Sequence, residues 1–199
     1  MDNEIKFKLF VDLDGTAAEF KNVSQIEQLY EPGYFYNLKP NMNVINAVKE
    51  IIKNRKSCVE VYILSAYLSD SKYALDEKKM WCDKYFPEID DEHRLFPTCG
   101  EDKTQYIAKK FGEINEQYFL LDDYSKNLHS WEPPACGIKI MNGINGTQGT
   151  WQGNSLSLER ESEDLARCIG EIMFKVSTYH DLGSNNEVEN VEMRRGNGR

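Results

Sequence analysis

The sequence lacks several features that would place it outside the ordinary globular proteins. No apolar stretch approaches the roughly 20 residues that a membrane span needs, and the opening residues MDNEIKFK lack the apolar middle of a signal peptide. The 199 residues include only five cysteines, an odd number without a CxxC pair, which argues against a disulfide framework or a zinc site. We expect reduced thiols in a cytoplasmic protein that has no membrane partner.

Basic charge is also in short supply. There are 24 Lys and Arg residues against 33 Asp and Glu, so the formal net charge at pH 7 is -9. Phosphate backbones bind basic surfaces, so this balance argues against a stable nucleic-acid complex. A small phosphorylated molecule remains compatible, because a few local cations and a metal ion suffice to bind it. The composition does not set the oligomeric state.

The hydrophobic content of 40% and the aromatic content of 12% are those of a folded chain. Strand-like runs occur at 6–12, 58–65, 118–123 and 136–141, and helical patterns at 41–54, 71–85, 103–111 and 158–176. Their alternation predicts an α/β fold, a Rossmann-like parallel sheet with helices on both faces. In such sheets, ligands bind at the carboxyl ends of the strands.

The length favours one main domain, which we place at residues 1–178. Residues 20–40 interrupt the alternation directly after the first strand and form a short, cap-like insertion. Residues 142–154 are rich in Asn and Gly, which predicts a loop or a small hairpin. The polar residues 179–199 are expected to form a mobile tail.

The first strand ends in the motif DLDGT, residues 12–16. Only Leu13 separates Asp12 from Asp14, and two neighbouring carboxylates oppose each other's ionisation unless a cation is present. Taken alone, the motif also fits a turn around Gly15 or a fragment of a calcium loop, although the further acids of such a loop are missing.

Other predicted strands also end in polar side chains. Ser65 ends the second strand, Asp122 and Asp123 end the third, and Lys103 begins a helix. The acids supply the oxygen ligands that Mg²⁺ prefers, while a serine, a lysine and loop amides would hold a phosphate beside the ion. Each residue also has a structural explanation, since Ser65 and Asp123 could be capping residues and Lys103 a surface lysine.

Along the chain, four motifs follow one another: DLDGT, an apolar strand ending in Ser65, Lys103, and an apolar strand ending in Asp122 and Asp123. In this order they resemble the motifs of the haloacid dehalogenase superfamily of phosphatases, over about residues 6–141. Six stretches further resemble the 5′(3′)-deoxyribonucleotidase family and its bacterial and phage relatives: DLDGTAAEF, GYFYNLKPNMNVINAVKEI, VYILSAY, EKKMWCDKYFP, DKT and LLDDYSKNL. The resemblance implies an enzyme that hydrolyses a small phosphomonoester, with a (deoxy)nucleoside monophosphate as the first candidate substrate.

The resemblance also assigns roles to individual residues. Asp12 would attack phosphorus and form an aspartyl-phosphate, which suits a carboxylate because it is ionised at neutral pH. Asp14 would protonate the leaving alkoxide and then activate water. The cofactor would be Mg²⁺, bound by Asp12, the backbone carbonyl of Asp14 and Asp122, and the phosphoryl oxygens would be bound by Ser65 and Lys103. Supporting roles fall to Asp123 and Thr16.

The chain departs from that family mainly in the insertion, which is too short for most of a cap. An aromatic wall for a nucleobase could still come from Phe20, Tyr34, Phe35 and Tyr36, and ordinary packing is the alternative. Glu101 stands where the family often has an arginine, and Lys78 or Lys79 could replace that charge or simply be solvated. Asn142, Asn145 and Trp151 could border the pocket or merely shape a turn.

Three alternatives remain at this point. The first keeps the chemistry but changes the substrate to another small phosphomonoester or a nucleic-acid phosphate end. The second is a phospho-accepting receiver domain, which would carry its paired acids on the first strand and its lysine last, whereas here the pair of Asp122 and Asp123 comes last. The third is a catalytically silent binding module, which would be expected to lack Asp12 or Asp14, and both are present.

Overall fold

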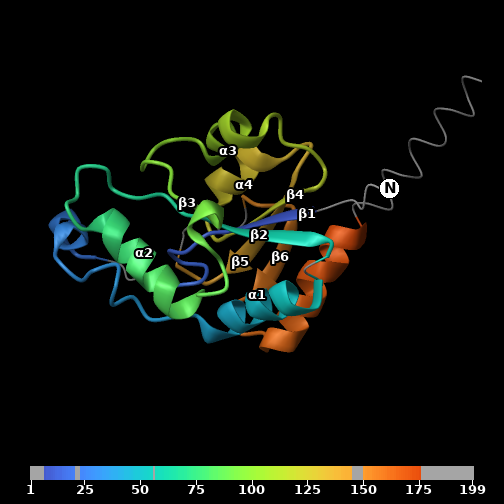
Figure 1. The fold of residues 1–199 in the computed structure, drawn as a ribbon, viewed down its shortest axis with the longest axis horizontal. Helices are drawn as coiled ribbons and strands as arrows, with labels where there is room; N and C mark the ends of the chain where they lie inside the picture. Colours follow the sequence, from blue (N-terminus) through green and yellow to red (C-terminus); the bar gives the residue numbers. More distant parts are fainter. Residues whose placement is uncertain (1–6, 21–22, 56, 145–149, 176–199) are drawn as a thin grey trace, which may run out of the picture.

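The computed structural model describes residues 7–20, 23–55, 57–144 and 150–175. Six strands form one parallel sheet in the order β3-β2-β1-β4-β5-β6 (Figure 1). The strands are β1 (Phe7–Val11), β2 (Val59–Leu64), β3 (Arg94–Leu95), β4 (Tyr118–Asp122), β5 (Cys136–Met141) and β6 (Asn154–Ser157). This confirms the predicted Rossmann-like α/β fold. The order also excludes a receiver domain, whose sheet runs 2-1-3-4-5.

Helices cover both faces of the sheet. They are α1 (Met42–Arg55), α2 (Ala74–Tyr85), α3 (Lys103–Phe111), α4 (Ser125–Trp131) and a helix over residues 162–175, with short 3₁₀ turns η1 (Ile26–Tyr30) and η2 (Asp91–His93). In Figure 1, α1 and the helix over residues 162–175 lie on one face, and α3 and α4 lie on the other. The prediction omitted α4 as a helix of its own, because seven residues hold too few turns to show a period. Within the described ranges, no helix is long and apolar enough to cross a membrane.

Side chains along the central strands alternate between two cores, as the two-residue period of a strand requires. Leu9 and Val11 of β1 pack with Ile45 of α1 in the larger core. Phe10 points the other way and packs with Leu128 of α4. Both faces of the sheet are therefore buried at β1 and β4, the two central strands. Polar side chains are then expected at the carboxyl ends of these strands, outside the two cores.

Residues 142–154 were predicted to form a loop or a small hairpin, and the described residues 142–144 and 150–153 lie in neither helix nor strand, as expected of a loop. The segment leads into β6, which the prediction did not include and which pairs parallel to β5 from Ile138 with Asn154 to Met141 with Ser157. The pattern missed β6 because Leu156 is its only buried residue. The predicted tail, residues 179–199, lies outside the described residues.

The insertion after β1 is fastened at its two ends. Ala18 forms an isolated bridge with Pro40, and the Glu19 N–H donates to the Lys39 carbonyl at 2.7 Å. The Trp81 indole of α2 donates to the carbonyl of Leu38 at 2.9 Å. The insertion therefore packs beside α2, as Figure 1 shows at the left of the molecule.

Candidate active site

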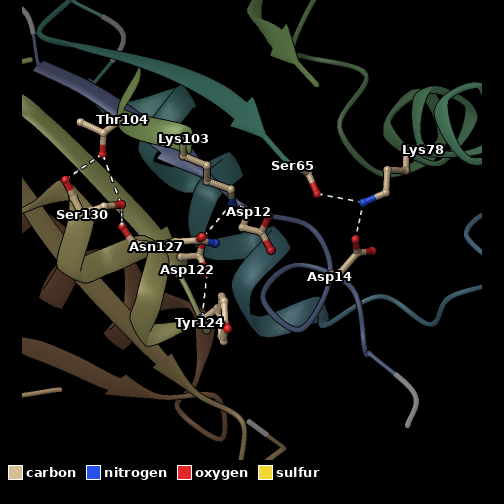
Figure 2. A network of polar contacts seen from close by, with 10 residues as sticks. All are labelled: Asp12, Asp14, Ser65, Lys78, Lys103, Thr104, Asp122, Tyr124, Asn127 and Ser130. Carbon is tan, nitrogen blue, oxygen red and sulfur yellow. Dashed lines mark hydrogen bonds and ion pairs between the residues drawn. The ribbon is translucent and has the colours of Figure 1, made fainter. Parts of the chain in front are cut away.

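The carboxyl ends of three neighbouring strands bring the predicted residues together. Asp12 directly follows β1, Ser65 directly follows β2, and Asp122 is the last residue of β4. Because β2, β1 and β4 are parallel neighbours, these side chains meet at one edge of the sheet. Figure 2 shows two groups of contacts at this edge: Lys103 of α3 contacts Asp12 and Asp122, and Lys78 of α2 contacts Ser65 and Asp14.

Lys103 joins two of the acids. Its Nζ lies 2.7 Å from Asp12 Oδ1 and 2.7 Å from Asp122 Oδ2, and all three side chains are buried. A cation in the first turn of a helix is disfavoured by the helix dipole, so the two carboxylates must account for its position. Burial opposes the charge of Lys103, but Asp12 and Asp122 outweigh burial and raise the pKa of the ammonium.

Three carboxylates offer oxygens within 4.8 Å of one another: those of Asp12, Asp122 and Asp123. Burial raises the pKa of Asp12 to about 6, although Lys103 opposes the shift. Burial, followed by the charges of Asp122 and Asp12, raises the pKa of Asp123 to about 7. The cluster is therefore short of positive charge even with Lys103 in place. Its oxygen donors fit a hard divalent cation.

This cluster differs from the predicted metal ligands in one side chain. It contains Asp12 and Asp122, and adds Asp123, for which the sequence indicated only a supporting role. The Asp14 carboxylate is not part of it and instead forms an ion pair with Lys78 (Figure 2). The prediction assigned only the backbone carbonyl of Asp14 to the metal.

Lys78 was left open by the sequence as either a replacement charge or a solvated lysine. It is 1% exposed, and besides pairing with Asp14 its Nζ donates to Ser65 Oγ at 3.0 Å. Its neighbour Lys79 is exposed. The available signal was the spacing along α2, where the buried residues are Ala74, Glu77, Lys78, Trp81 and Cys82, because three- and four-residue steps place side chains on one helix face.

The loop after Asp12 lies directly against Asp123. Gly15 has φ +87°, and a Cβ at this position would come within 2.3 Å of Asp123 Oδ2. The Asn142 side-chain amide donates to the Gly15 carbonyl at 2.7 Å and to Asp123 Oδ2 at 2.8 Å. Thr16 is fully buried, and its carbonyl accepts a hydrogen bond from Asn41. Asn142 thus holds the loop against Asp123 at the end of β4, and Asn41 holds the loop through the Thr16 carbonyl.

Two further supporting side chains were missed by the sequence interpretation. Asn127 of α4 donates to Asp122 Oδ2 at 2.9 Å. Lys139 of β5 donates to the Asp123 carbonyl at 2.8 Å and to Ser125 Oγ at 2.6 Å. The signal for Lys139 was a lone lysine inside the apolar strand CGIKIM, where it pairs in register with Asp122.

A pocket of about 290 Å³ opens over the acids and Lys103, and Phe20, Ala66, Tyr124 and Asn127 complete its lining. Of the four aromatic residues predicted to form a wall, Phe20 is therefore the one that lines this pocket. The second ring, Tyr34, is half-buried; burial and then the Asp14 carboxylate raise the pKa of its hydroxyl.

The other two predicted rings, Phe35 and Tyr36, do not line this pocket. Phe35 is buried in the larger core, with its ring centroid 5.0 Å from Lys78 Nζ. Tyr36 lies beside Lys84, whose Nζ is 5.6 Å from the ring centroid. The reason is that the turn carrying both rings is bound to α2 instead of folding over the pocket.

Glu101 and Trp151 do not line this pocket either. Glu101 pairs with Lys109 at 3.1 Å, so its charge is balanced along α3. The Trp151 indole donates to the Asn154 carbonyl at 2.9 Å, and its ring lies 5.3 Å from that of His129. Position 145, the third polar candidate of that loop, is outside the described residues.

No family model matches the chain, and no curated protein matches it in sequence. Among solved structures, a hypothetical protein from Xanthomonas campestris superimposes with a TM-score of 0.53 at 12% identity, covering 88% of this chain and 87% of that one. A haloacid dehalogenase-like hydrolase from Burkholderia xenovorans superimposes with a TM-score of 0.52 at 9% identity, covering 81% and 95%. The chain has a haloacid dehalogenase-like fold.

Two other matches cover less than half of the matched chain. This chain spans 47% of a matched chain in the Pnkp1/Rnl/Hen1 complex, with a TM-score of 0.48 and 18% identity, and 28% of DsGPDH from Dunaliella salina. One haloacid dehalogenase-like fold can support many activities, so the activity must be argued from the site.

Proposed function

We propose that the protein is a Mg²⁺-dependent phosphomonoester hydrolase. The observation that carries this proposal is the buried arrangement of Asp12, Lys103 and Asp122, with 2.7 Å contacts from one ammonium to both acids. A phosphatase must place an anionic nucleophile against an anionic phosphate, so it needs positive charge at the same point. Lys103 supplies part of that charge.

The metal ligands would be Asp12, Asp122 and Asp123, the three acids with oxygens within 4.8 Å. A bound Mg²⁺ would offset the repulsion between the carboxylate nucleophile and the phosphate. The protein's contribution is to keep these acids buried and oriented. Asn127 does this for Asp122, and Asn142 does it for Asp123.

The first step would be attack by a carboxylate oxygen of Asp12 on phosphorus. An Asp12–phosphorus bond forms while the bond from phosphorus to the substrate's alcohol oxygen breaks, and that oxygen takes a proton from Asp14, which must enter this step protonated. Lys103 and Ser65 would hold phosphoryl oxygens during the transfer. The products of this step are a free alcohol and an aspartyl-phosphate on Asp12.

The second step would release inorganic phosphate. Asp14, now ionised, takes a proton from a water molecule, whose oxygen bonds to phosphorus as the bond to Asp12 breaks. The Asp12 carboxylate is restored and Asp14 is again protonated. Asp14 therefore regains in the second step the proton that it gave up in the first.

For the substrate, we propose a nucleoside monophosphate. The supporting feature is the pair of aromatic residues in the pocket lining, Phe20 and Tyr124, because aromatic rings stack on any base. Tyr124 directly follows the acid pair and is 41% exposed. It would take over part of the role that the sequence assigned to Phe35 and Tyr36.

A phosphate-release screen tests both levels of this proposal. Nucleoside 5′- and 3′-monophosphates, common sugar phosphates and a 3′-phosphorylated oligonucleotide would each be supplied with Mg²⁺ or with EDTA. We expect release that requires Mg²⁺ and is fastest with a nucleotide. Absence of release from every compound would contradict the phosphatase assignment, whereas a preference for sugar phosphates would contradict only the nucleotide assignment.

The raised pKa values predict how Mg²⁺ stabilisation depends on pH. An acid whose pKa is raised by folding destabilises the metal-free protein above that pKa, and the penalty disappears as pH falls toward its ordinary value. For Asp12 and Asp123, with pKa values of about 6 and about 7, the penalty is nearly complete at about pH 8. A cation that binds the ionised acids removes this penalty, while protons compete with it at lower pH.

We therefore expect Mg²⁺ to raise the unfolding temperature at about pH 8 and to have little effect at about pH 5. Thermal unfolding followed by circular dichroism, with Mg²⁺ or EDTA, measures this. Asp122→Asn is the matched control and should lose the response at the higher pH. An equal response to Mg²⁺ at both pH values would show that these acids are not its ligands.

A further inference from the structure

Lys78 is a buried cation that the proposed reaction does not use. It comes from α2 rather than from the end of a strand, yet its Nζ pairs with the Asp14 carboxylate and donates to Ser65 Oγ at 3.0 Å. In Figure 2, Asp14 points toward Lys78, whereas Asp12 lies on the side of Lys103. In the DLDGT motif, Lys103 thus pairs with Asp12 and Lys78 pairs with Asp14.

The residue before Lys78 is also charged and buried. Glu77 is 8% exposed, and its carboxylate accepts the backbone N–H groups of Gly33, of Phe35 at 3.0 Å and of Tyr36 at 3.4 Å. Burying a carboxylate and an ammonium is costly unless each is paired, and here each finds its partners in a different part of the molecule. Glu77 binds the insertion, and Lys78 binds the site.

The same turn of the insertion also reaches the ammonium. The ring centroid of Phe35 lies 5.0 Å from Lys78 Nζ, within the range of a cation–π contact. The insertion therefore contributes to the site indirectly, by fixing the helix and the ammonium that hold Asp14. This accounts for the burial of Phe35 in place of a position in the pocket wall.

We propose that Lys78 is a positioning residue for Asp14, and that Glu77 fixes Lys78 by binding the insertion; this rests on the phosphatase function proposed above. Asp14 lies in a loop, where its carboxylate has no strand or helix to orient it. A single ammonium bonded to Asp14 and Ser65 sets the separation between the proton carrier and the phosphate-binding hydroxyl. The side chain of Lys78 is only 2% exposed, so it acts through these two partners.

The dependence on the leaving group distinguishes this role from direct phosphate binding. An alkyl alcohol leaves poorly without a proton, so hydrolysis of an alkyl phosphate depends on a well-placed acid. The p-nitrophenolate ion leaves readily without one. Because kcat/KM reports the steps up to the first irreversible one, a misplaced Asp14 lowers kcat/KM for the alkyl ester and spares that for the aryl ester. Loss of a phosphate contact would lower both equally.

The experiment compares Lys78→Met with wild type on an alkyl phosphate and on p-nitrophenyl phosphate, both with Mg²⁺. We expect kcat/KM to fall about 10²-fold or more for the alkyl ester and less than about 10-fold for the aryl ester. Lys79→Met removes the same charge from an exposed position of α2 and should leave both values unchanged. Lys78→Arg should recover part of the loss, since it restores a cation.

Glu77→Gln tests the second half of the proposal. The amide keeps an acceptor but loses the charge, so we expect the same preference for the aryl ester in weaker form. Asp76→Asn, at an exposed position of the same helix, is the control. The urea midpoint of every variant separates these effects from unfolding. An equal loss on both esters, or no loss in Lys78→Met, would overturn the positioning role while leaving the phosphatase function in place.

Hydrogen exchange provides a measurement that does not depend on activity. If wild type releases no phosphate, the proposed function is wrong, and amide exchange at residues 13–18 still reports whether Lys78 holds the Asp14 loop. We expect about 10-fold faster exchange in Lys78→Met than in wild type or Lys79→Met. Unchanged exchange would contradict the tether itself.

Discussion

Asp12→Asn should abolish phosphate release and leave the fold intact. The amide has nearly the shape of the carboxylate and keeps an oxygen for the Lys103 ammonium, which lies 2.7 Å from Asp12 Oδ1 in the native protein. It is not a nucleophile at neutral pH, so the aspartyl-phosphate cannot form. We expect kcat to fall by about 10⁴-fold or more, the scale seen when a nucleophile is removed.

Two measurements check the Asp12 prediction. Phosphate release under Mg²⁺ gives kcat, and acid quenching with a ³²P-labelled substrate should trap a labelled protein in wild type but not in the variant. Asp76→Asn makes the same chemical change at an exposed position of α2 and should keep full activity. If Asp12→Asn remains active or still traps phosphate, the nucleophile has been assigned to the wrong residue.

Lys103→Met should have the largest effect on stability. It removes the ammonium bonded to Asp12 and Asp122, which are 6% and 0% exposed, and leaves both carboxylates without their cation. Removing one partner from a buried ion pair typically costs about 3–5 kcal/mol of unfolding free energy. Phosphate release should also fall steeply, because the same ammonium is proposed to hold phosphoryl oxygens.

The stability loss in Lys103→Met should depend on pH in a definite direction. Without Lys103, which lowers the pKa of Asp12 in the native protein, that pKa rises further above its ordinary value. The ionised Asp12 lowers the unfolding free energy fully above the raised pKa, and this loss is relieved as the acid takes up a proton. The difference in unfolding free energy between Lys103→Met and wild type should therefore shrink as the pH falls from about 8 to about 5.

Urea unfolding in EDTA at both pH values measures this dependence. Lys109→Met, on the exposed side of the same helix, breaks only a surface ion pair and should change stability by no more than about 1 kcal/mol. A Lys103→Met deficit that is the same at both pH values would mean that unpaired carboxylates are not its cause.

The sequence was sufficient to predict the sheet and the residues at its carboxyl edge. Alternating strands and helices specify a parallel sheet, and in such a sheet Asp12, Ser65 and Asp122 must meet because each follows or ends a strand. Lys103 could be added because it begins a helix at the same edge. These inferences need only local patterns and one topological rule.

The roles of Lys78 and Phe35 could not be predicted in the same way. A lysine on a helix is usually solvated, and an apolar ring fits a core as well as a pocket wall. Both outcomes depend on how the insertion packs against α2, and that is decided by Glu77 binding three backbone amides of the insertion. Such a contact joins residues more than 40 positions apart and has no short-range signature.

The attachment of the insertion bears on which step would limit turnover. Its ends are joined through Ala18 and Pro40, and its turn is bound to α2 through Glu77. A segment fixed at these points would not have to swing aside for each substrate molecule of the proposed hydrolase. We therefore expect bond making and breaking at phosphorus, and not the opening of a gate, to limit its turnover.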